Sequence, residues 1–178
     1  MGKTCAFSGP RPQNLPFKFN ENDIRCIALK HDIRHSIIEL IEKEGYTHFV
    51  SGVALGFDTY AAEIVLELKS VYSGITLEAA VPCENQDIKW PEASRLRYRR
   101  LLNQCDKLTC CQKEYSSYCM VARNKYLIQT ADCLLTLHRA SSSGTQSTFR
   151  QAILAGKRIK WVELRSIDSA KHRLSIVD

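Results

Sequence analysis

The chain has no hydrophobic run long enough to cross a membrane and no recognisable export signal. No apolar stretch in its 178 residues reaches the roughly 18 residues that a helical span requires. The apolar run 4–7 is too short for the core of a signal peptide, and no small-residue cleavage site follows it. We therefore expect a cytoplasmic protein with no membrane partner.

Metal-binding cysteine motifs are also missing, although the sequence contains eight cysteines. Cys110, Cys111 and Cys119 form no CxxC pair, and no second cluster follows at the spacing of a zinc site. His31 and His35 lie four residues apart on a predicted helix, and we expect them to be surface histidines. The sequence therefore predicts reduced thiols and no metal.

The familiar glycine-rich nucleotide motifs are absent too. Gly52 and Gly56 are four residues apart, which does not fit G-x-G-x-x-G, and the chain has no G-x-x-x-x-G-K-[ST] sequence. These absences argue against an ordinary dinucleotide-dependent dehydrogenase and against a P-loop NTPase.

Positive charge, by contrast, is in excess. The chain has 25 Lys and Arg against 19 Asp and Glu, a formal net charge of +6, and its densest basic run is 95–100. This excess favours an anionic ligand or partner, but it does not choose between a nucleotide and a nucleic acid.

Strand-like and helix-like segments alternate along the whole chain. Short apolar runs predict strands at 3–8, 47–51, 75–81, 108–110, 133–137 and 158–164. Apolar residues at helical spacing predict helices at 33–45, 58–68, 91–104, 117–131 and 149–156, with Asp58 and Ser117 as N-caps. The alternation predicts a single Rossmann-like, doubly wound α/β domain over residues 1–164, with about six mostly parallel strands and helices on both faces. Residues 165–178 are expected to form a polar, loosely held C-terminal tail.

Three unusual turns follow predicted strands. They are 8–12 (SGPRP), 51–56 (SGVALG) and 143–145 (SGT). In a doubly wound sheet, ligands bind at the carboxyl ends of the strands, and helix N-termini there favour anions. Glycine also lets the backbone approach a phosphate. Such turns can merely close a strand-to-helix connection, but three on one edge favour a phosphate-bearing ligand.

The chain resembles a known family in five segments. They are TCAFSGPRP (4–12), SGVALGFDTYAAE (51–63), RLRYRRLLNQCD (95–106), CMVARNKYLIQTADCLL (119–135) and SGTQSTFRQAILAGK (143–157). Their order and content resemble the YpsA-like branch of the SLOG superfamily. The resemblance implies a Rossmann-like domain related to DNA-processing protein A and to the LOG phosphoribohydrolases, many of which are thought to bind nucleotides or their derivatives. It also makes a homodimer plausible.

The resemblance assigns a ligand site residue by residue. Its three loops would contain, in order, Ser8, Gly9 and Arg11; Ser51, Gly52, Gly56 and Asp58; and Gly144 and Thr145. Two positions depart from the family pattern. Pro10 replaces the usual histidine of TGHRP, which removes a hydrogen-bonding group, and Ser143 replaces the first glycine of GGT.

The LOG motif PGGxGTxxE is not reproduced. Aligning Gly144 and Thr145 places Thr148 where that motif has its glutamate, and a threonine cannot do a carboxylate's work in cleaving an N-glycosidic bond. Arg123 matches a functional arginine of those enzymes, whereas Asn124 replaces the lysine that follows. Hydrolysis of that type is therefore not expected unless Asp58 or Glu63 substitutes, and we favour capping and helix-dipole roles for those two carboxylates.

The basic run offers a further phosphate ligand. Arg99 could reach a phosphate while Tyr98 stacks on a base, although half of the run must be a solvated face. The same run could instead line a groove for single-stranded nucleic acid, with Tyr115, Tyr118 and Trp90 as stacking residues. Asn124 is expected on the inward side of its helix, where it orients the ligand loop or makes a structural hydrogen bond.

Three functions remain open. The leading hypothesis is binding or sensing of a nucleotide-derived, phosphate-bearing small ligand, with no cofactor and no efficient catalytic group. The alternatives are a nucleotide-processing N-glycosidic hydrolase and a single-stranded DNA-binding protein.

Overall fold

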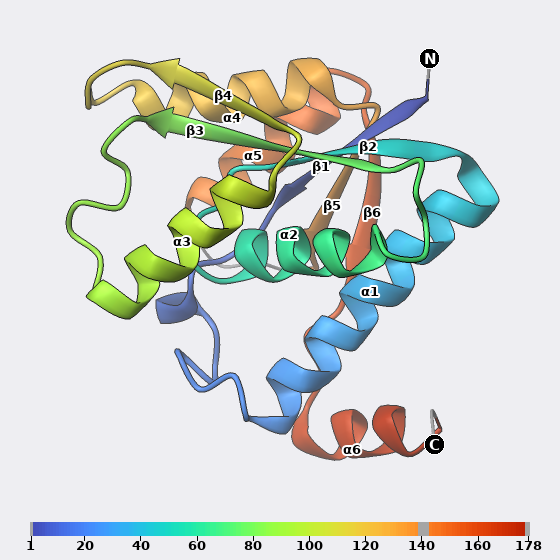
Figure 1. Ribbon diagram of the computed structural model, residues 1–178. Helices are drawn as coiled ribbons and strands as arrows, with labels where there is room; N and C mark the ends of the chain where they lie inside the picture. The colour runs from blue at the N-terminus through green and yellow to red at the C-terminus, as the bar shows by residue number, and fades with distance from the viewer. Residues whose placement is uncertain (1, 139–142, 177–178) are drawn as a thin grey trace.

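Six parallel strands form one central sheet in the computed structural model, which describes residues 2–138 and 143–176. The strand order is β4-β3-β2-β1-β5-β6 (Figure 1). The strands are β1 (Lys3–Ser8), β2 (Tyr46–Ser51), β3 (Thr76–Cys83), β4 (Lys107–Gln112), β5 (Cys133–Leu137) and β6 (Arg158–Val162). Together with helices on both faces, this order confirms the predicted Rossmann-like α/β domain.

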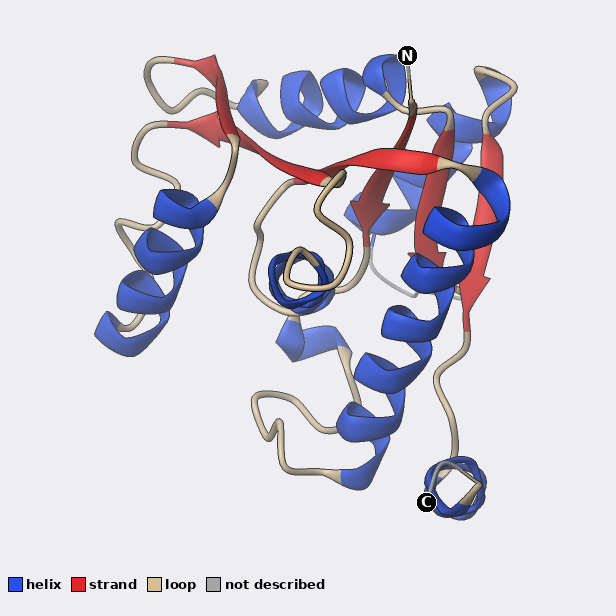
Figure 2. Cartoon of the chain, turned by 45° about the vertical axis from the view of Figure 1, so that its right-hand side comes forward, coloured by secondary structure: helices blue, strands red, loops and turns tan. Residues whose placement is uncertain are grey.

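Six α-helices cover the two faces of the sheet. They are α1 (Ile24–Glu44), α2 (Phe57–Leu68), α3 (Glu92–Gln104), α4 (Cys119–Thr130), α5 (Ser143–Leu154) and α6 (Ile167–Ser175), with a short 3-10 turn, η1 (Pro12–Asn14), after β1. Helix α1 packs on α2 and α6, whereas α4 packs on α5. Figures 1 and 2 show these two helical layers on opposite sides of the strands. No helix in the described residues is both long and apolar enough to span a bilayer.

The sheet buries a different set of side chains on each of its faces. Phe7 and Phe49 stack at 5.9 Å between their ring centroids, in the core beneath α1 and α2. Ala6, Val50 and Ala80 lie in the separate cluster that includes residues of α4 and α5. This alternation follows from the period of two along a strand, and the small side chains let the second helical layer approach closely.

Helix beginnings differ from the sequence prediction at three places. Helix α2 is capped by Gly56, so Asp58 is its second residue rather than its N-cap. Tyr118, not Ser117, precedes α4 and makes no side-chain cap. Helix α5 begins at Ser143, so Gly144 and Thr145 lie in its first turn instead of in a loop. The predicted turn residues Ser141 and Ser142 lie outside the described residues.

The segment predicted to be a loosely held tail carries the helix α6. Ala170 of this helix is fully buried, and Ser166 caps its N-terminus by accepting a hydrogen bond from the Ser169 amide. Asp32 of α1 accepts hydrogen bonds from Arg165 at 2.6 Å and from Arg173 at 2.9 Å. The prediction was wrong because this segment is fixed by partners far away in the sequence.

The connection from β4 to β5 creates a topological switch point. Strands β1 to β4 extend the sheet in one direction, and the chain then returns to place β5 on the free side of β1. The loops after β1 and β5 therefore diverge to opposite faces and leave a crevice at their carboxyl ends.

Candidate functional site: a cationic pocket at the switch point

A pocket of about 280 Å³ lies at the carboxyl ends of the central strands. We call it the cationic pocket; its lining residues are Ser8, Gly9, Arg11, Asn14, Ala54, Asp58, Met120, Arg123, Asn124, Gly144, Thr145 and Thr148. They come from the turn after β1, the turn before α2, the first half of α4 and the start of α5. The structure thus brings the three predicted turns to one site.

Arg123 is the central cation of this pocket. Arg123 is 7% exposed. Its Nη1 donates a hydrogen bond to the Gly52 carbonyl at 3.0 Å, and its Nε donates one to the side-chain oxygen of Asn124 at 2.8 Å. Both acceptors are neutral; the Asp58 carboxyl interacts electrostatically with Arg123, but among the described residues no carboxylate lies within 4 Å of it as an ion pair. Burial lowers the pKa of the guanidinium from its usual range. A buried charge without an ion-pair partner costs free energy that a bound anion would offset.

Asp58 faces the same pocket and is 4% exposed. One of its oxygens accepts a hydrogen bond from the Gly9 amide at 3.0 Å. Burial raises the pKa of this carboxyl to about 6, although Arg123, the Gly9 amide and Arg11 act in the opposite direction. The group can therefore be protonated or ionised close to neutral pH, which lets it donate or accept a hydrogen bond.

A tight turn positions Asp58. The Ser51 hydroxyl donates to the Asp58 carbonyl at 2.9 Å and accepts from the Val53 amide at 3.0 Å. Val53 is buried with a φ of +44°, a left-handed conformation that a β-branched residue rarely adopts. Such strain persists only where surrounding contacts determine the backbone, as these two hydrogen bonds do here.

The glycines of this turn make room for protein groups rather than for a ligand. A Cβ on Gly52 would lie 1.9 Å from Arg123 Nη1, and a Cβ on Gly56 would lie 2.7 Å from the Pro10 carbonyl oxygen. Neither glycine, nor Ser51, lines the pocket. The nearby amides of Phe57 and Thr59 donate to the carbonyls of Pro10 and Ala54.

Helix α5 supplies the better anion-binding terminus. Gly144 and Thr145, in its first turn, both line the pocket. The helix dipole makes such a terminus favourable for negative charge. With Arg123 buried and Arg11 at the exposed rim, three sources of positive potential converge on one space.

The pocket lacks a pair of carboxylates. Thr148, at the position of the LOG glutamate, is 1% exposed and donates its hydroxyl to the Gly144 carbonyl at 3.1 Å. Among the described lining residues, Asp58 is the single carboxylate. Glu63 lies outside the pocket, where both of its oxygens accept hydrogen bonds from Arg97 at 2.6 Å. The structure therefore does not place Glu63 where it could act with Asp58.

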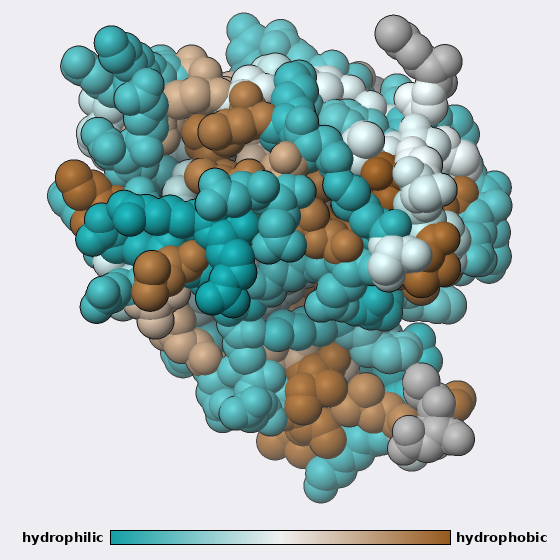
Figure 3. Space-filling view, viewed as in Figure 1, coloured by the Kyte–Doolittle hydropathy of each residue, from teal (hydrophilic) through white to brown (hydrophobic). Residues whose placement is uncertain are grey.

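The other predicted phosphate and stacking residues lie elsewhere. Arg99 is on α3, away from the pocket lining, with its Nε 3.5 Å from Asp87. Tyr98, which was expected to stack on a base, is buried and packs against the partly buried Trp90 in a T-shaped arrangement. The most hydrophilic colouring in Figure 3 lies over α3. Arg99 and Arg100 of this run are exposed, whereas Arg95 and Arg97 are half-buried beside carboxylates.

The sequence did not predict the full lining. Asn14, Ala54 and Met120 complete the pocket, and of these Asn14 depends on η1 folding the chain back after Pro12. The prolines around 10–12 were the available signal, since they favour a sharp turn. All eight cysteines are free thiols, and the described residues contain no group of His, Cys, Asp and Glu side chains able to hold a metal ion.

These features define a Rossmann-like α/β domain with a buried cation at its switch point. Residues 5–171 match the family model described as the YspA SLOG family, and the chain belongs to this YpsA family. It is 32% identical to a UPF0398 protein of Halalkalibacterium halodurans over 149 residues, which are 83% of this chain and 78% of that protein. It is 30% identical to the SPbeta prophage-derived protein YoqJ of Bacillus subtilis over 138 residues, or 71% and 81% of the two chains.

Two solved structures share the fold. The first is DNA processing protein A from Helicobacter pylori, whose structure was described for its single-stranded DNA binding mode. The match has a TM-score of 0.58 and 17% sequence identity, and it covers 99% of this chain and 80% of the Helicobacter pylori chain. The other is DNA processing protein A from Streptococcus pneumoniae, with a TM-score of 0.53 and 15% identity. The match covers 99% of this chain but spans only 56% of the pneumococcal protein.

Proposed function

We propose that the protein binds a nucleotide-derived, phosphate-bearing small molecule in the cationic pocket. The observation that carries this proposal is Arg123, a buried guanidinium that lines the pocket and whose two hydrogen-bond acceptors are both neutral. A phosphate between Arg123 and the first turn of α5 would add negative charge beside this cation through charge-assisted hydrogen bonds. Arg11 at the rim would attract the anion as it approaches.

The rest of the pocket suits a sugar rather than a second phosphate. Asp58 and the amides of Asn14 and Asn124 offer both donors and acceptors for hydroxyl groups. A volume of about 280 Å³ is close to the lower end of the range for small-molecule sites, about 300–1,000 Å³. This space matches a sugar phosphate better than a longer polymer.

The proposed activity is binding or sensing, with the ligand returned intact. N-glycosidic cleavage usually employs two carboxyl groups, and the second position holds Thr148, whose hydroxyl is engaged with the helix backbone. The hydrolase alternative would have to act through Asp58 alone. It predicts release of free base from a nucleoside monophosphate and loss of that release in Asp58→Asn.

Calorimetric titration of AMP, GMP, CMP, UMP and ribose 5-phosphate tests the proposal. We expect stoichiometric binding of at least one of them, and Arg123→Met should weaken it by roughly 10- to 100-fold because a charge-assisted hydrogen bond is lost. Arg99→Ala is the matched control, since it removes an arginine outside the pocket. Failure of every compound to bind, or equal binding by Arg123→Met, would contradict the proposal.

A second candidate is binding of single-stranded DNA. It is supported by Tyr115 and Tyr118, which are 75% and 72% exposed in the segment between β4 and α4, and by exposed arginines on α3. Aromatic faces and backbone-tracking cations are the usual means of binding single strands. If this function holds, affinity for an oligonucleotide will fall steeply with salt. Tyr118→Ala and Arg99→Ala will then weaken it while Arg123→Met does not.

A further inference from the structure

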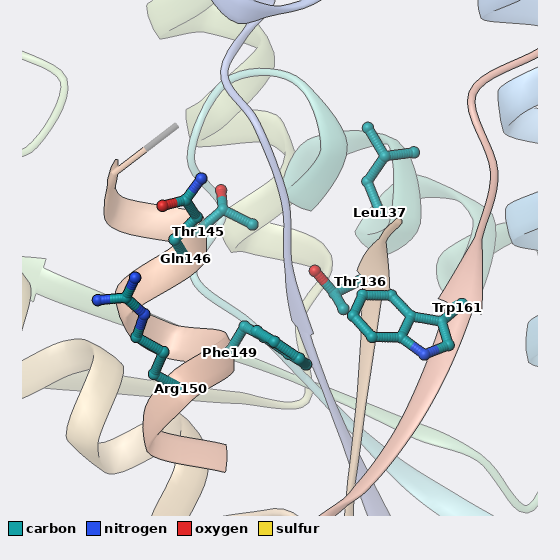
Figure 4. Close-up of a pocket in the computed structure, with 7 residues that line it drawn as sticks. All are labelled: Thr136, Leu137, Thr145, Gln146, Phe149, Arg150 and Trp161. Atoms are coloured by element: carbon teal, nitrogen blue, oxygen red, sulfur yellow. The ribbon is translucent and has the colours of Figure 1, made fainter. Parts of the chain in front are cut away.

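A second cavity, of about 310 Å³, lies between α5 and the strands β5 and β6. We call it the aromatic cavity because Phe149 and Trp161 line it, with their ring centroids 4.9 Å apart. Figure 4 shows Phe149 reaching from α5 toward Trp161 on β6, and Arg150 on the α5 side. Trp161 stays 41% exposed.

One buried polar group in this cavity has no partner. Thr136 of β5 is 1% exposed, and its Oγ1 makes no hydrogen bond with any described residue. In Figure 4 this oxygen points toward α5. A buried hydroxyl without a hydrogen bond is destabilising, and a polar partner in the cavity would satisfy it.

The two cavities are neighbours along one row of the sheet. Ser8 pairs in register with Thr136, and Thr136 pairs in register with Trp161, so the three side chains point to the same face. Ser8 lines the cationic pocket, and the other two residues line the aromatic cavity. Ser8 and Trp161, at the two ends of this row, are therefore two interstrand spacings apart, or roughly 10 Å. Thr145, in the first turn of α5, lines both cavities.

We propose that the aromatic cavity holds the nucleobase of the ligand whose phosphate and sugar occupy the cationic pocket. This inference rests on the proposed function and assigns the ligand class as a nucleotide with an intact base. A planar ring would contact the aromatic wall, where base stacking is favourable for any base. The Thr136 hydroxyl would donate to, or accept from, an edge of that ring. The spacing of the row fits a ligand that joins a phosphate to a base through a sugar.

The test compares base-containing and base-free ligands in matched variants. Each nucleoside monophosphate named above and ribose 5-phosphate are titrated into the wild type, Thr136→Val and Trp161→Leu. We expect at least one nucleotide to bind roughly 5- to 100-fold more tightly than ribose 5-phosphate. Thr136→Val should weaken the binding of that nucleotide roughly three- to tenfold and leave the affinity for ribose 5-phosphate unchanged. The unliganded Thr136→Val variant should melt no lower than the wild type, because the hydroxyl has no partner to lose.

Fluorescence gives an independent readout. The chain has two tryptophans, Trp90 and Trp161, and only Trp161 lines the cavity. Nucleotide binding should quench the emission of the wild type, and Trp161→Phe should abolish that quenching while Trp90→Phe retains it. The inference would be overturned if nucleotides and ribose 5-phosphate bound with equal affinity and if neither Thr136→Val nor Trp161→Leu changed that affinity. The proposed function would then still stand. No binding of any of these ligands would overturn both.

Discussion

Arg123 Nη1 donates a hydrogen bond to the carbonyl of Gly52 at 3.0 Å and occupies the space that a side chain on Gly52 would need. The same missing side chain would also approach Asp58 Oδ2 to 3.0 Å. One glycine thus permits the buried cation and the buried carboxyl to face a common pocket.

Gly52→Ala should abolish nucleotide binding at a small cost in stability. The new methyl group would displace the end of the Arg123 side chain, which can move, so we expect a loss of about 1–2 kcal/mol in the free energy of unfolding. Gly74→Ala is the control, because its Cβ would meet nothing within 4 Å. Titration and thermal melting of both variants measure the effect; unchanged affinity in Gly52→Ala would show that the position of Arg123 is unimportant.

Arg123→Met should keep or raise the stability of the unliganded protein. Replacing a buried charge by an apolar side chain of similar length removes its desolvation cost, and Asp58, whose pKa is raised by burial, can take up a proton when the nearby cation is gone. Chemical denaturation without ligand is the measurement. A loss of more than about 2 kcal/mol would instead indicate that the hydrogen bonds to Gly52 and Asn124 hold the fold together.

Asp58 should make the protein more stable as pH falls toward 4. Its pKa is about 6 in the folded protein, above the value of about 3.9 expected in an unfolded chain. Between these values the folded state binds more protons, so this contribution to the free energy of unfolding decreases as pH rises from about 4 to about 6. Relative to Asp58→Asn, the wild type should gain about 2 kcal/mol between pH 7 and pH 4.

A carboxyl titration followed by NMR gives the direct check on Asp58. Its carbon resonance should move with a midpoint near 6, and a midpoint below about 4.5 would be inconsistent with the burial described above. The comparison with Asp58→Asn is necessary because the pKa values of other carboxyls, such as Glu39, are lowered and change stability in the opposite sense.

Gly56→Ala should destabilise the protein more than Gly45→Ala. Both residues have positive φ, +93° and +73°, but Gly45 lies in the left-handed helical region, where alanine costs about 1–2 kcal/mol, whereas Gly56, with a ψ of −130°, lies outside it in a region that other residues adopt even less readily. Only at Gly56 would the Cβ also collide with backbone, 2.7 Å from the Pro10 carbonyl oxygen. Equilibrium unfolding should show an additional loss of about 1–3 kcal/mol for Gly56→Ala. Equal losses would mean that the turn after β1 shifts freely.

Asp32→Ala should release α6 without affecting the cationic pocket. Asp32 is the shared acceptor for Arg165 and Arg173, and its loss should cost about 1–3 kcal/mol because these pairs are only partly buried. Hydrogen exchange should accelerate in α6 amides and stay unchanged in α4. Lys171→Ala, an exposed substitution on α6, is the control; slow exchange in α6 of Asp32→Ala would show that apolar contacts alone hold the helix.

The sequence predicted the sheet well because buried parallel strands are continuous apolar runs. The run 133–137 is predicted and observed with the same bounds. The first residues of the helices were harder to predict, since they depend on hydrogen-bond partners that the local sequence pattern does not reveal. At α4 the hydroxyl of Ser116, not a cap at Ser117, accepts from the Tyr118 amide. Helix α6 was missed altogether because Asp32 lies more than a hundred residues away.

The candidate site was predictable where it depends on topology alone. Turns that follow parallel strands share an edge, so residues such as Ser8 and Asp58 could be brought together in advance. Gly9 and Gly144 line the pocket but Gly52 and Gly56 do not, and the sequence does not reveal that Arg123 fills the space beside Gly52. The aromatic cavity could not be predicted either, since it depends on the register that aligns Thr136 with Trp161.

The cationic pocket draws its walls from four segments, 8–14, 54–58, 120–124 and 144–148, which together span most of the chain. A ligand that touches all four acts as a reversible cross-link between the beginning and the end of the domain. Occupancy should therefore slow unfolding of the whole molecule rather than of one loop. Resistance to proteolysis would then rise together across distant cleavage sites, and survival in a crude extract would report whether the natural ligand is present.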